Sequence, residues 1–316
     1  MSGRRFRNAL CRSALLLAAV LASSCGRAPA DSPSAPADPA SAVGWRMLEP
    51  GLELGEFRAP RPADAGDSMV RVLRIDPARF DLRLMNASNS TEKLPLTAAE
   101  WARRHDLVAA INPSMYQEDH SRSVSLMLTR SHVNNSFLSK DRAVLAFDRL
   151  DDTVPRVQII DRDCQDFDTL RQHYGTLVQS IRMVSCDGRN VWTLQPRKWS
   201  TAAIGVDRQG RVLFIHVRSP YSTHDLIGIL LELPLDLHNA MYTEGGPEAQ
   251  LFVRSGGREL QFVGSFGTDP DAGGDATAWP VPNVVGVVRR DDPGRGPAAR
   301  EDPRTGDHGS DSGSRR

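Results

Sequence analysis

The segment Met241–Val253 carries two carboxylates and two glycines between two apolar runs. Carboxylates such as Glu244 and Glu248 serve enzymes as general acids, general bases or nucleophiles. Gly245 and Gly246 lack a Cβ, which lets the backbone take positive φ or lets a ligand approach closely. The segment therefore predicts either a turn that handles a substrate or an ordinary hairpin turn between two strands.

Polar residues also follow an apolar run at 107–111, which we expect to be a strand buried on both faces. Asn112 and Tyr116 would then stand at the edge of a sheet, where polar groups can face a cleft. The alternative is a turn in which Asn112 hydrogen-bonds its own backbone. Both interpretations place these two residues just beyond the end of a core strand.

Two further strand-like runs carry polar side chains. Gln179 and Arg182 lie in the first, and Arg182 either holds a phosphate through its forked guanidinium or faces solvent. Thr201 leads into the second, where it either contacts a substrate or only ends the strand.

The stretch from His216 to Asp225 joins an apolar strand to a predicted helix. The free N–H groups and the dipole at a helix N-terminus favour anions. His216, Arg218, Tyr221 and His224 make this stretch more polar than a connection requires, so among these last four stretches it has the best local case for function. Asp225 is an alternative to Glu248 as a second carboxylate.

The overall composition excludes several classes of protein. The 39 basic residues balance 39 acidic ones, and we find no basic patch with interleaved aromatics, so the sequence predicts no nucleic-acid partner. It contains no Walker loop, HExxH or G-x-S-x-G motif. Cys164 and Cys186 lack the clustered His or Cys partners that a zinc site requires, so we expect neither metal nor cofactor.

Short strands with few helices predict an α+β fold, a single domain built on a mixed sheet. Residues 69–75 and 80–84 alternate and are expected to pair as a hairpin through 76–79. A second hairpin is expected from 202–206 and 212–217. Three helices are expected, at 97–105 with a capping box, at 166–174 and at 223–233.

The N-terminus resembles an export signal, with three arginines before a short apolar run. We expect residues 1–24 to be a signal peptide, with Cys25 lipidated and 25–42 forming a flexible linker, although ordinary cleavage nearby is the alternative. The folded domain is expected at 43–288, and 289–316 has the composition of a disordered tail. The protein would then be an exported lipoprotein of the bacterial cell envelope, attached to the membrane by its lipid.

The cysteine count agrees with this localisation. Cys11 leaves with the signal, and lipidation of Cys25 would leave Cys164 and Cys186 as one even pair. An oxidising envelope would allow these two to form a disulfide.

The order of these motifs resembles the phosphodiester glycosidase (NAGPA-type) domain family, over roughly Val70 to Val288. Residues 110–116 match an Ala-Ile-Asn turn, Gln179-Ser180 a Gln-Ser strand, 201–207 an Arg-Thr-Ala-Ile-Gly-Val-Asp strand and 243–246 a Leu-Asp-Gly-Gly turn. The chain departs from the pattern at Thr201-Ala202, at Pro113-Ser114 and at Glu244. The resemblance implies a secreted or membrane-associated hydrolase of sugar phosphodiesters, with Asn112, Gln179, Glu244, Gly245 and Gly246 as site residues.

On this hypothesis Glu244 is the essential carboxylate, since glycoside cleavage commonly uses two carboxyl groups. The second would be Glu248 or Asp225, Asn112 and Gln179 would position sugar hydroxyls, and Arg182 would hold the phosphate. The rival hypothesis is a non-catalytic lipoprotein that binds glycan or cell-wall polymer on the same scaffold.

Overall fold

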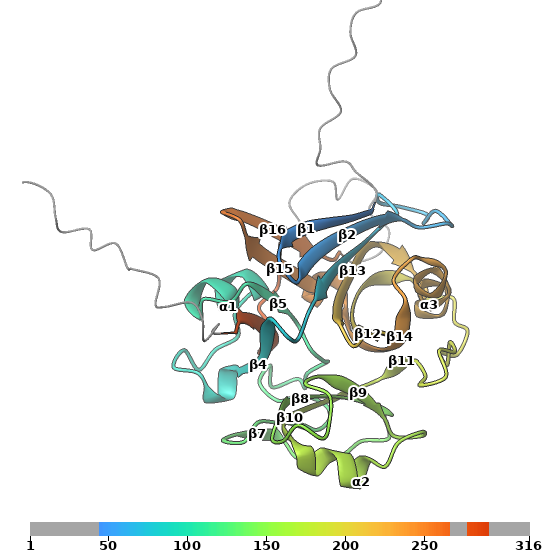
Figure 1. Cartoon of the computed structure of the whole chain (residues 1–316). Coiled ribbons are helices and arrows are strands. Elements are labelled where there is room, and N and C mark those ends of the chain that lie inside the picture. Colours follow the sequence, from blue (N-terminus) through green and yellow to red (C-terminus); the bar gives the residue numbers. More distant parts are fainter. Residues whose placement is uncertain (1–43, 266–276, 291–316) are drawn as a thin grey trace, which may run out of the picture. The chain divides into compact units, whose positions relative to one another are not determined.

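The computed structural model describes residues 44–265 and 277–290, which form three sheets with a few short helices (Figure 1). The predicted signal peptide, Cys25, the linker and the tail beyond Arg290 lie outside the described residues. The last strand ends at Arg289, one residue into the predicted tail.

The largest sheet has seven strands in the order β1-β2-β3-β13-β12-β14-β11. Their bounds in that order are Gly44–Glu49, Leu52–Arg58, Met69–Ile75, Val212–Tyr221, Trp199–Asp207, Leu237–Gly245 and Arg182–Val184. It is called the seven-stranded sheet below.

Two five-stranded sheets complete the fold, named here by their central strands. The β10 sheet has the order β7-β6-β10-β8-β9, with bounds Val133–Asn135, Met127–Leu128, Tyr174–Ser180, Ala143–Arg149 and Gln158–Asp161. The β5 sheet has the order β16-β15-β5-β17-β4, with bounds Arg258–Val263, Gln250–Ser255, Ala109–Ile111, Asn283–Arg289 and Phe80–Asn86.

Helices are short. The α-helices are α1 (Ala98–Arg104), α2 (Phe167–Leu170) and α3 (Thr223–Glu232), and 3₁₀ turns lie at Ala87–Asn89 (η2), Arg171–His173 (η3) and Gly246–Glu248 (η4). The capping box predicted for α1 is confirmed, because the side chains of Thr97 and Glu100 each accept a backbone N–H of the other residue. The helix expected at 166–174 is only one short turn of α-helix and one of 3₁₀.

Two expectations about strand pairing are wrong. All strand pairs among the described residues are antiparallel, so the sheets are not mixed; β13 and β14 run parallel to each other, but β12 lies between them. The predicted hairpin of β3 and β4 is also absent, because β3 pairs with β2 and β13 while β4 pairs with β17 in another sheet. The hairpin of β12 and β13 is confirmed, with Gly210 at φ +80° in its turn.

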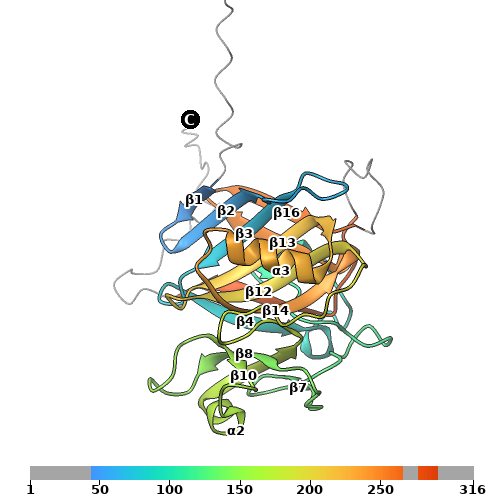
Figure 2. The same cartoon turned by 90° about the vertical axis from the view of Figure 1, so that its right-hand side faces the viewer.

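One hydrophobic core joins the three sheets. It contains Leu73 and Phe214 of the seven-stranded sheet, Val285 of the β5 sheet, and Leu145 and Val178 of the β10 sheet. A second core lies on the other face of the seven-stranded sheet, where α3 covers β12, β13 and β14 (Figure 2). The seven-stranded sheet is therefore buried on both faces at its centre, which fixes the position of β14, the strand that carries Glu244 near its end.

Candidate functional site

Glu244 stands at the end of β14, where the strand departs from regular pairing. The register between β12 and β14 shifts after the pairing of Ala202 with Glu244, since Ala203 next pairs with Tyr242. Thr243 is the extra residue of this β-bulge, a feature that bends a strand and re-aims its side chains. The Glu244 Oε1 atom accepts the Gly245 N–H at 3.0 Å, and η4 then carries the chain to Glu248.

The two glycines of this turn are needed for different reasons. Gly246 has φ +63°, a conformation that glycine adopts without steric penalty. Gly245 is extended, with φ −124°, but a Cβ there would stand 2.7 Å from both Trp199 Cδ1 and the Tyr242 hydroxyl. Gly245 therefore lets two aromatic side chains pack directly against the backbone beside Glu244.

The two carboxyl groups hold their protons more tightly than ordinary glutamates. Burial raises the pKa of Glu244 to about 7, and the Glu248 charge adds to the shift against one opposing hydrogen bond from the Gly245 backbone. Burial also raises the pKa of Glu248, opposed by Tyr116 and by the charge of His120. Desolvation and a like charge both disfavour the ionised form, so this pair can retain a proton near neutral pH.

Two phenols share the environment of the carboxylates. Burial and the charges of Glu248 and Glu244 raise the pKa of Tyr116 to about 12, and its hydroxyl hydrogen-bonds Glu248. Burial and the same two carboxylates raise the pKa of Tyr242 as well. Both phenols thus remain protonated and can donate hydrogen bonds.

Asn112 and His216 contact the backbone that follows the turn, at Gln250 and Ala249. The Asn112 Oδ1 atom accepts the Gln250 N–H at 3.1 Å, while the buried Asn112 Nδ2 atom has no partner among the described residues. His216 is fully buried and lies with Nε2 3.1 Å from the Ala249 carbonyl oxygen. Burial lowers the pKa of His216 to about 3, so its neutral ring donates Nε2–H to that carbonyl.

Thr201 and Arg218 lie on the strands next to β14. Thr201 pairs with Gly245 across the sheet, and its buried hydroxyl has no partner in the described part of the chain. Arg218 is half-buried, and its charge contributes to the lowered pKa of His216. The structure thus brings Glu244, Glu248, Tyr116, Asn112, Thr201, His216 and the two glycines into one neighbourhood, with Arg218 beside it.

Three other candidates have structural partners elsewhere. Gln179 is buried, and its amide bonds the backbone at Leu126, Ser139 and Asp141. Asp225 accepts the Ser222 hydroxyl at 2.7 Å at the start of α3.

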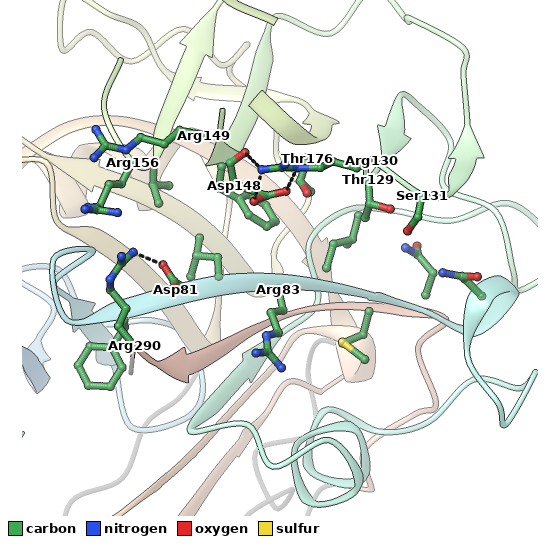
Figure 3. A pocket seen from close by; sticks show the side chains of 18 of the residues that line it. Asp81, Arg83, Thr129, Arg130, Ser131, Asp148, Arg149, Arg156, Thr176 and Arg290 are labelled. Carbon is green, nitrogen blue, oxygen red and sulfur yellow. Dashed lines mark hydrogen bonds and ion pairs between the residues drawn. The ribbon is translucent and has the colours of Figure 1, made fainter. Parts of the chain in front are cut away.

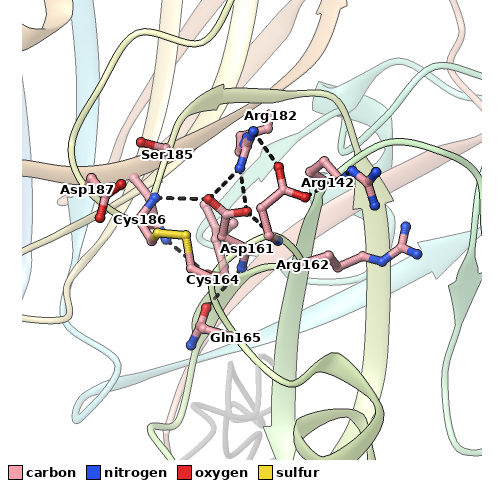
Figure 4. Close-up of polar contacts among 12 residues, drawn as sticks. Arg142, Asp161, Arg162, Cys164, Gln165, Arg182, Ser185, Cys186 and Asp187 are labelled. Atoms are coloured by element: carbon pink, nitrogen blue, oxygen red, sulfur yellow. Dashed lines mark hydrogen bonds and ion pairs between the residues drawn. A yellow bond between two sulfur atoms is a disulfide. The ribbon is translucent and has the colours of Figure 1, made fainter.

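Arg182 is the third, and it is bound to carboxylates (Figure 4). Its guanidinium donates to both oxygens of Asp161, at 2.7 and 2.9 Å, and pairs with Asp163 at 2.8 Å. The predicted disulfide between Cys164 and Cys186 is confirmed, and the Cys186 N–H also donates to Asp161. A guanidinium so fully neutralised is a structural element, and it is a poor candidate for a phosphate ligand.

Asp161, Cys164 and Cys186 are also the one group of potential metal ligands found within residues 44–265 and 277–290. The sulfurs are joined to each other and the carboxylate is bound to Arg182, so the group offers no ligand set.

Sequence reasoning did not propose Tyr242, Trp199 or His120 as site residues. Tyr242 lies within an apolar run and so resembles an ordinary core residue. Trp199 precedes a core strand with nothing local to mark it. His120 lies next to Tyr116, with ring centroids 5.4 Å apart, and only the fold shows that its charge acts on Glu248.

Comparison with known proteins identifies a family. The family model of phosphodiester glycosidase matches residues 105–288, which include β5, the bulge and the Glu244 turn. No curated protein has a matching sequence.

Two solved structures share the fold. The zebrafish N-acetylglucosamine-1-phosphodiester alpha-N-acetylglucosaminidase catalytic domain, auto-inhibited by its pro-peptide, has a TM-score of 0.56 at 11% identity over 79% of this chain and 87% of that one. A protein from Synechocystis has a TM-score of 0.52 at 14% identity, over 79% of this chain and 65% of that chain. The family match spans more than half of the sequence, and the chain therefore belongs to the phosphodiester glycosidase family.

Proposed function

We propose that the protein hydrolyses a sugar phosphodiester at the Glu244 turn. The observation that carries this proposal is the pair of close carboxyl groups, Glu244 and Glu248, with the pKa of Glu244 raised to about 7. Glycoside cleavage commonly uses two carboxyl groups, and the one that acts as the general acid has a raised pKa. The family match supports the same chemistry.

In this reaction the bond between the sugar's anomeric carbon and the phosphate oxygen breaks, and water supplies the new hydroxyl on the sugar. The phosphate leaves with the bonding electron pair, and Glu244 is placed to give it a proton. Because phosphate is already a good leaving group, weak assistance by an acid of this pKa suffices. Glu248, which the Tyr116 hydroxyl and His120 help to keep ionised, serves as the base or the nucleophile.

Aromatic and polar neighbours supply the means to hold a sugar. Trp199 and Tyr242 pack against Gly245 and leave no room there for a side chain. The unpartnered Asn112 Nδ2 and Thr201 hydroxyl can each bond a sugar hydroxyl. Asn112 keeps the role proposed from the sequence, whereas Gln179 does not, because its amide is occupied by backbone groups.

The place of action proposed here is the cell envelope of a bacterium, with the protein attached through lipid on Cys25. The disulfide supports an oxidising compartment. None of the helices in the described part of the chain is long and apolar enough to cross a membrane. A Cys25→Ser protein should leave the membrane fraction, and one that still sediments with membranes would contradict lipid attachment.

The test of function is hydrolysis of a panel of chromogenic sugar phosphodiesters. The intact protein should release the chromophore, and Glu244→Gln should cut turnover by about 10²-fold or more, as for loss of an acid–base group. Glu232→Gln, a change at an exposed ion pair with Arg61, is the matched control and should turn over normally.

Activity of Glu244→Gln equal to that of the wild type would remove Glu244 from the chemistry. A wild type that cleaves no member of the panel but binds the sugars would favour the non-catalytic binding protein.

A further inference from the structure

The loop at 112–126 connects β5 to β6 and carries two of the groups that act on Glu248. The Tyr116 hydroxyl hydrogen-bonds the Glu248 carboxyl, and the charge of His120 attracts it. Together with the Glu248 backbone N–H, these two groups oppose the effect of burial and favour the ionised carboxylate. The proton affinity of Glu248 therefore depends on where this loop holds Tyr116 and His120.

The loop folds back on itself as a short antiparallel ladder. Tyr116 lies opposite Ser123 in a β-bridge, and the Gln117 N–H donates to the Arg122 carbonyl oxygen at 2.7 Å. The tip turns at His120, whose φ is +48° and whose N–H donates to the Gln117 carbonyl oxygen at 2.9 Å. The positions of Tyr116 and His120 are therefore set by the returning arm, which contains Ser123.

One buried side chain holds that arm. Asn134 lies in β7 and is 7% exposed. Its Oδ1 atom accepts the Ser123 N–H at 2.8 Å, and its Nδ2 atom donates to the Ser121 carbonyl oxygen at 3.0 Å. The amide thus bonds the backbone groups that a neighbouring strand would otherwise bond. Only a side chain that has both a donor and an acceptor can do this.

The surroundings of Asn134 fix the orientation of its amide. The second N–H of Nδ2 donates to the Ser88 hydroxyl at 3.0 Å, so both donors and the oxygen of the amide are used. The next residue, Asn135, donates from Nδ2 to the Ser123 carbonyl oxygen at 2.7 Å. Two successive side chains of β7 therefore hold the backbone of Ser123 on both its N–H and its C=O.

The strand that carries Asn134 is itself held firmly. In the turn before β7, Arg130 donates to both carboxylate oxygens of Asp148 in β8, at 2.8 and 2.9 Å (Figure 3). Gly175 of β10 leaves room for this pair, because a Cβ there would clash with both side chains. The loop beside Glu248 is thus attached to the β10 sheet, which does not carry the Glu244 turn.

We propose that Asn134 is a positioning residue, which holds the loop that places Tyr116 and His120 beside Glu248. This proposal rests on the proposed function, in which Glu248 acts in its ionised form. Without the Asn134 amide the loop is no longer held, and Glu248 loses a hydrogen bond and a positive charge that favour ionisation. Glu244 and Tyr242 also lie beside Glu248, but neither can carry a positive charge in place of His120.

The experiment is the pH dependence of kcat/KM on a chromogenic sugar phosphodiester. Because Glu248 acts when ionised, a change that favours its neutral form moves the acid limb of the profile to higher pH. Asn134→Ala should lower the ratio of kcat/KM at pH 5 to that at pH 7 by at least about threefold. A merely structural loss would lower both values alike and would overturn the proposal.

A second variant and a matched control isolate the amide. Asn134→Asp keeps the size and the acceptor for Ser123 but loses the donor to Ser121, and it should lower the ratio as Asn134→Ala does. Asn239 is 4% exposed and donates from Nδ2 to the Ile159 carbonyl oxygen at 2.9 Å. Asn239→Ala and Asn239→Asp lose a similar buried bond and should leave the ratio unchanged. An equal fall in the Asn239 variants would overturn the proposal.

A double-mutant comparison tests whether Asn134 acts through the loop. In a Tyr116→Phe/His120→Ala protein, Asn134→Ala should change the ratio no further, because the groups that it positions are gone. A further fall of the same size would show that Asn134 acts by another route, and the proposal would be overturned.

NMR titration of the Glu248 carboxyl carbon, assigned by its absence in Glu248→Gln, requires no turnover. Asn134→Ala should move the midpoint to higher pH, and Asn239→Ala should not. An unmoved midpoint in a protein that cleaves sugar phosphodiesters would contradict the role of Asn134 alone. A moved midpoint in a protein that cleaves none of them would contradict the proposed function alone.

Discussion

Asp161 is a buried carboxylate and Glu244 a half-buried one, and their surroundings are opposite. The Asp161 side chain is 2% exposed and receives two hydrogen bonds from Arg182 and one from the Cys186 backbone. Glu244 receives one backbone hydrogen bond, from Gly245, and faces a second carboxylate and two phenols.

This difference separates a structural carboxylate from a chemical one. A buried charge that is paired and hydrogen-bonded serves to hold neighbouring elements in place. A buried carboxyl beside a like charge holds its proton to higher pH, which is the condition that acid–base catalysis exploits. The disulfide lies beside Asp161, and the two glycines lie beside Glu244. The two carboxylates are therefore held by different structural features.

The largest expected effect comes from removing the partner of Asp161. Arg182→Ala leaves a charge uncompensated at 2% exposure, and unfolding in urea should show a loss of about 3–5 kcal/mol. Arg189→Ala, which breaks an ion pair that is exposed on both sides, should change stability by less than about 1 kcal/mol. Equal effects of the two changes would show that Asp161 is not held as described.

Removal of the disulfide should have the next effect. Cys164 and Cys186 are 22 residues apart in sequence, and the closed loop stabilises by about 3 kcal/mol in the chain-entropy model. Cys164→Ser/Cys186→Ser should therefore lose about that much in chemical unfolding. Turnover per folded molecule should be kept, because the disulfide supports Asp161 and not Glu244. A stable but inactive double serine variant would contradict the separation of the two regions.

Glu244→Gln should stabilise the protein at alkaline pH. The folded-state pKa of about 7 lies above the ordinary value of 4.5, so ionised Glu244 disfavours the folded state as pH rises from 4.5 through 7. The variant should gain up to about 3 kcal/mol over the wild type at pH 8 and little or nothing at pH 4. Unfolding curves at the two pH values measure this, and a gain at pH 4 equal to that at pH 8 would contradict it.

The smallest expected effect is that of Gly245→Ala. The new Cβ meets Trp199 and Tyr242 at 2.7 Å, and such overpacking should lower stability by about 1–3 kcal/mol. Gly228→Ala, in α3 with only the flexible Arg61 side chain nearby, should instead be neutral or stabilising. If Gly245→Ala proved as stable as the wild type, the aromatic side chains would not pack there as described.

Local features of this fold were predictable from sequence, and long-range ones were not. The capping box of Thr97 and Glu100 and the turn at Gly210 each depend on a few consecutive residues. β4 pairs with β17, which lies about 200 residues further along the chain, and nothing near residue 80 indicates this pairing. Short, adjacent alternating strands therefore predicted a hairpin that the fold does not form.

The same limit applies to the candidate sites. Glu244 and Glu248 could be proposed because carboxylates and glycines are adjacent in sequence. The sequence could not show that the Gln179 amide and the Arg182 guanidinium are already hydrogen-bonded, because their partners come from other loops and strands.

Glu244 keeps a proton near neutral pH because it is partly removed from water and lies beside the charge of Glu248. NMR titration of the side-chain carboxyl carbon of Glu244, assigned by its absence in Glu244→Gln, measures this directly. The pKa should be about 7, and Glu248→Gln should lower it by removing the neighbouring charge. A pKa near 4.5 in the wild type, unmoved by Glu248→Gln, would contradict the account.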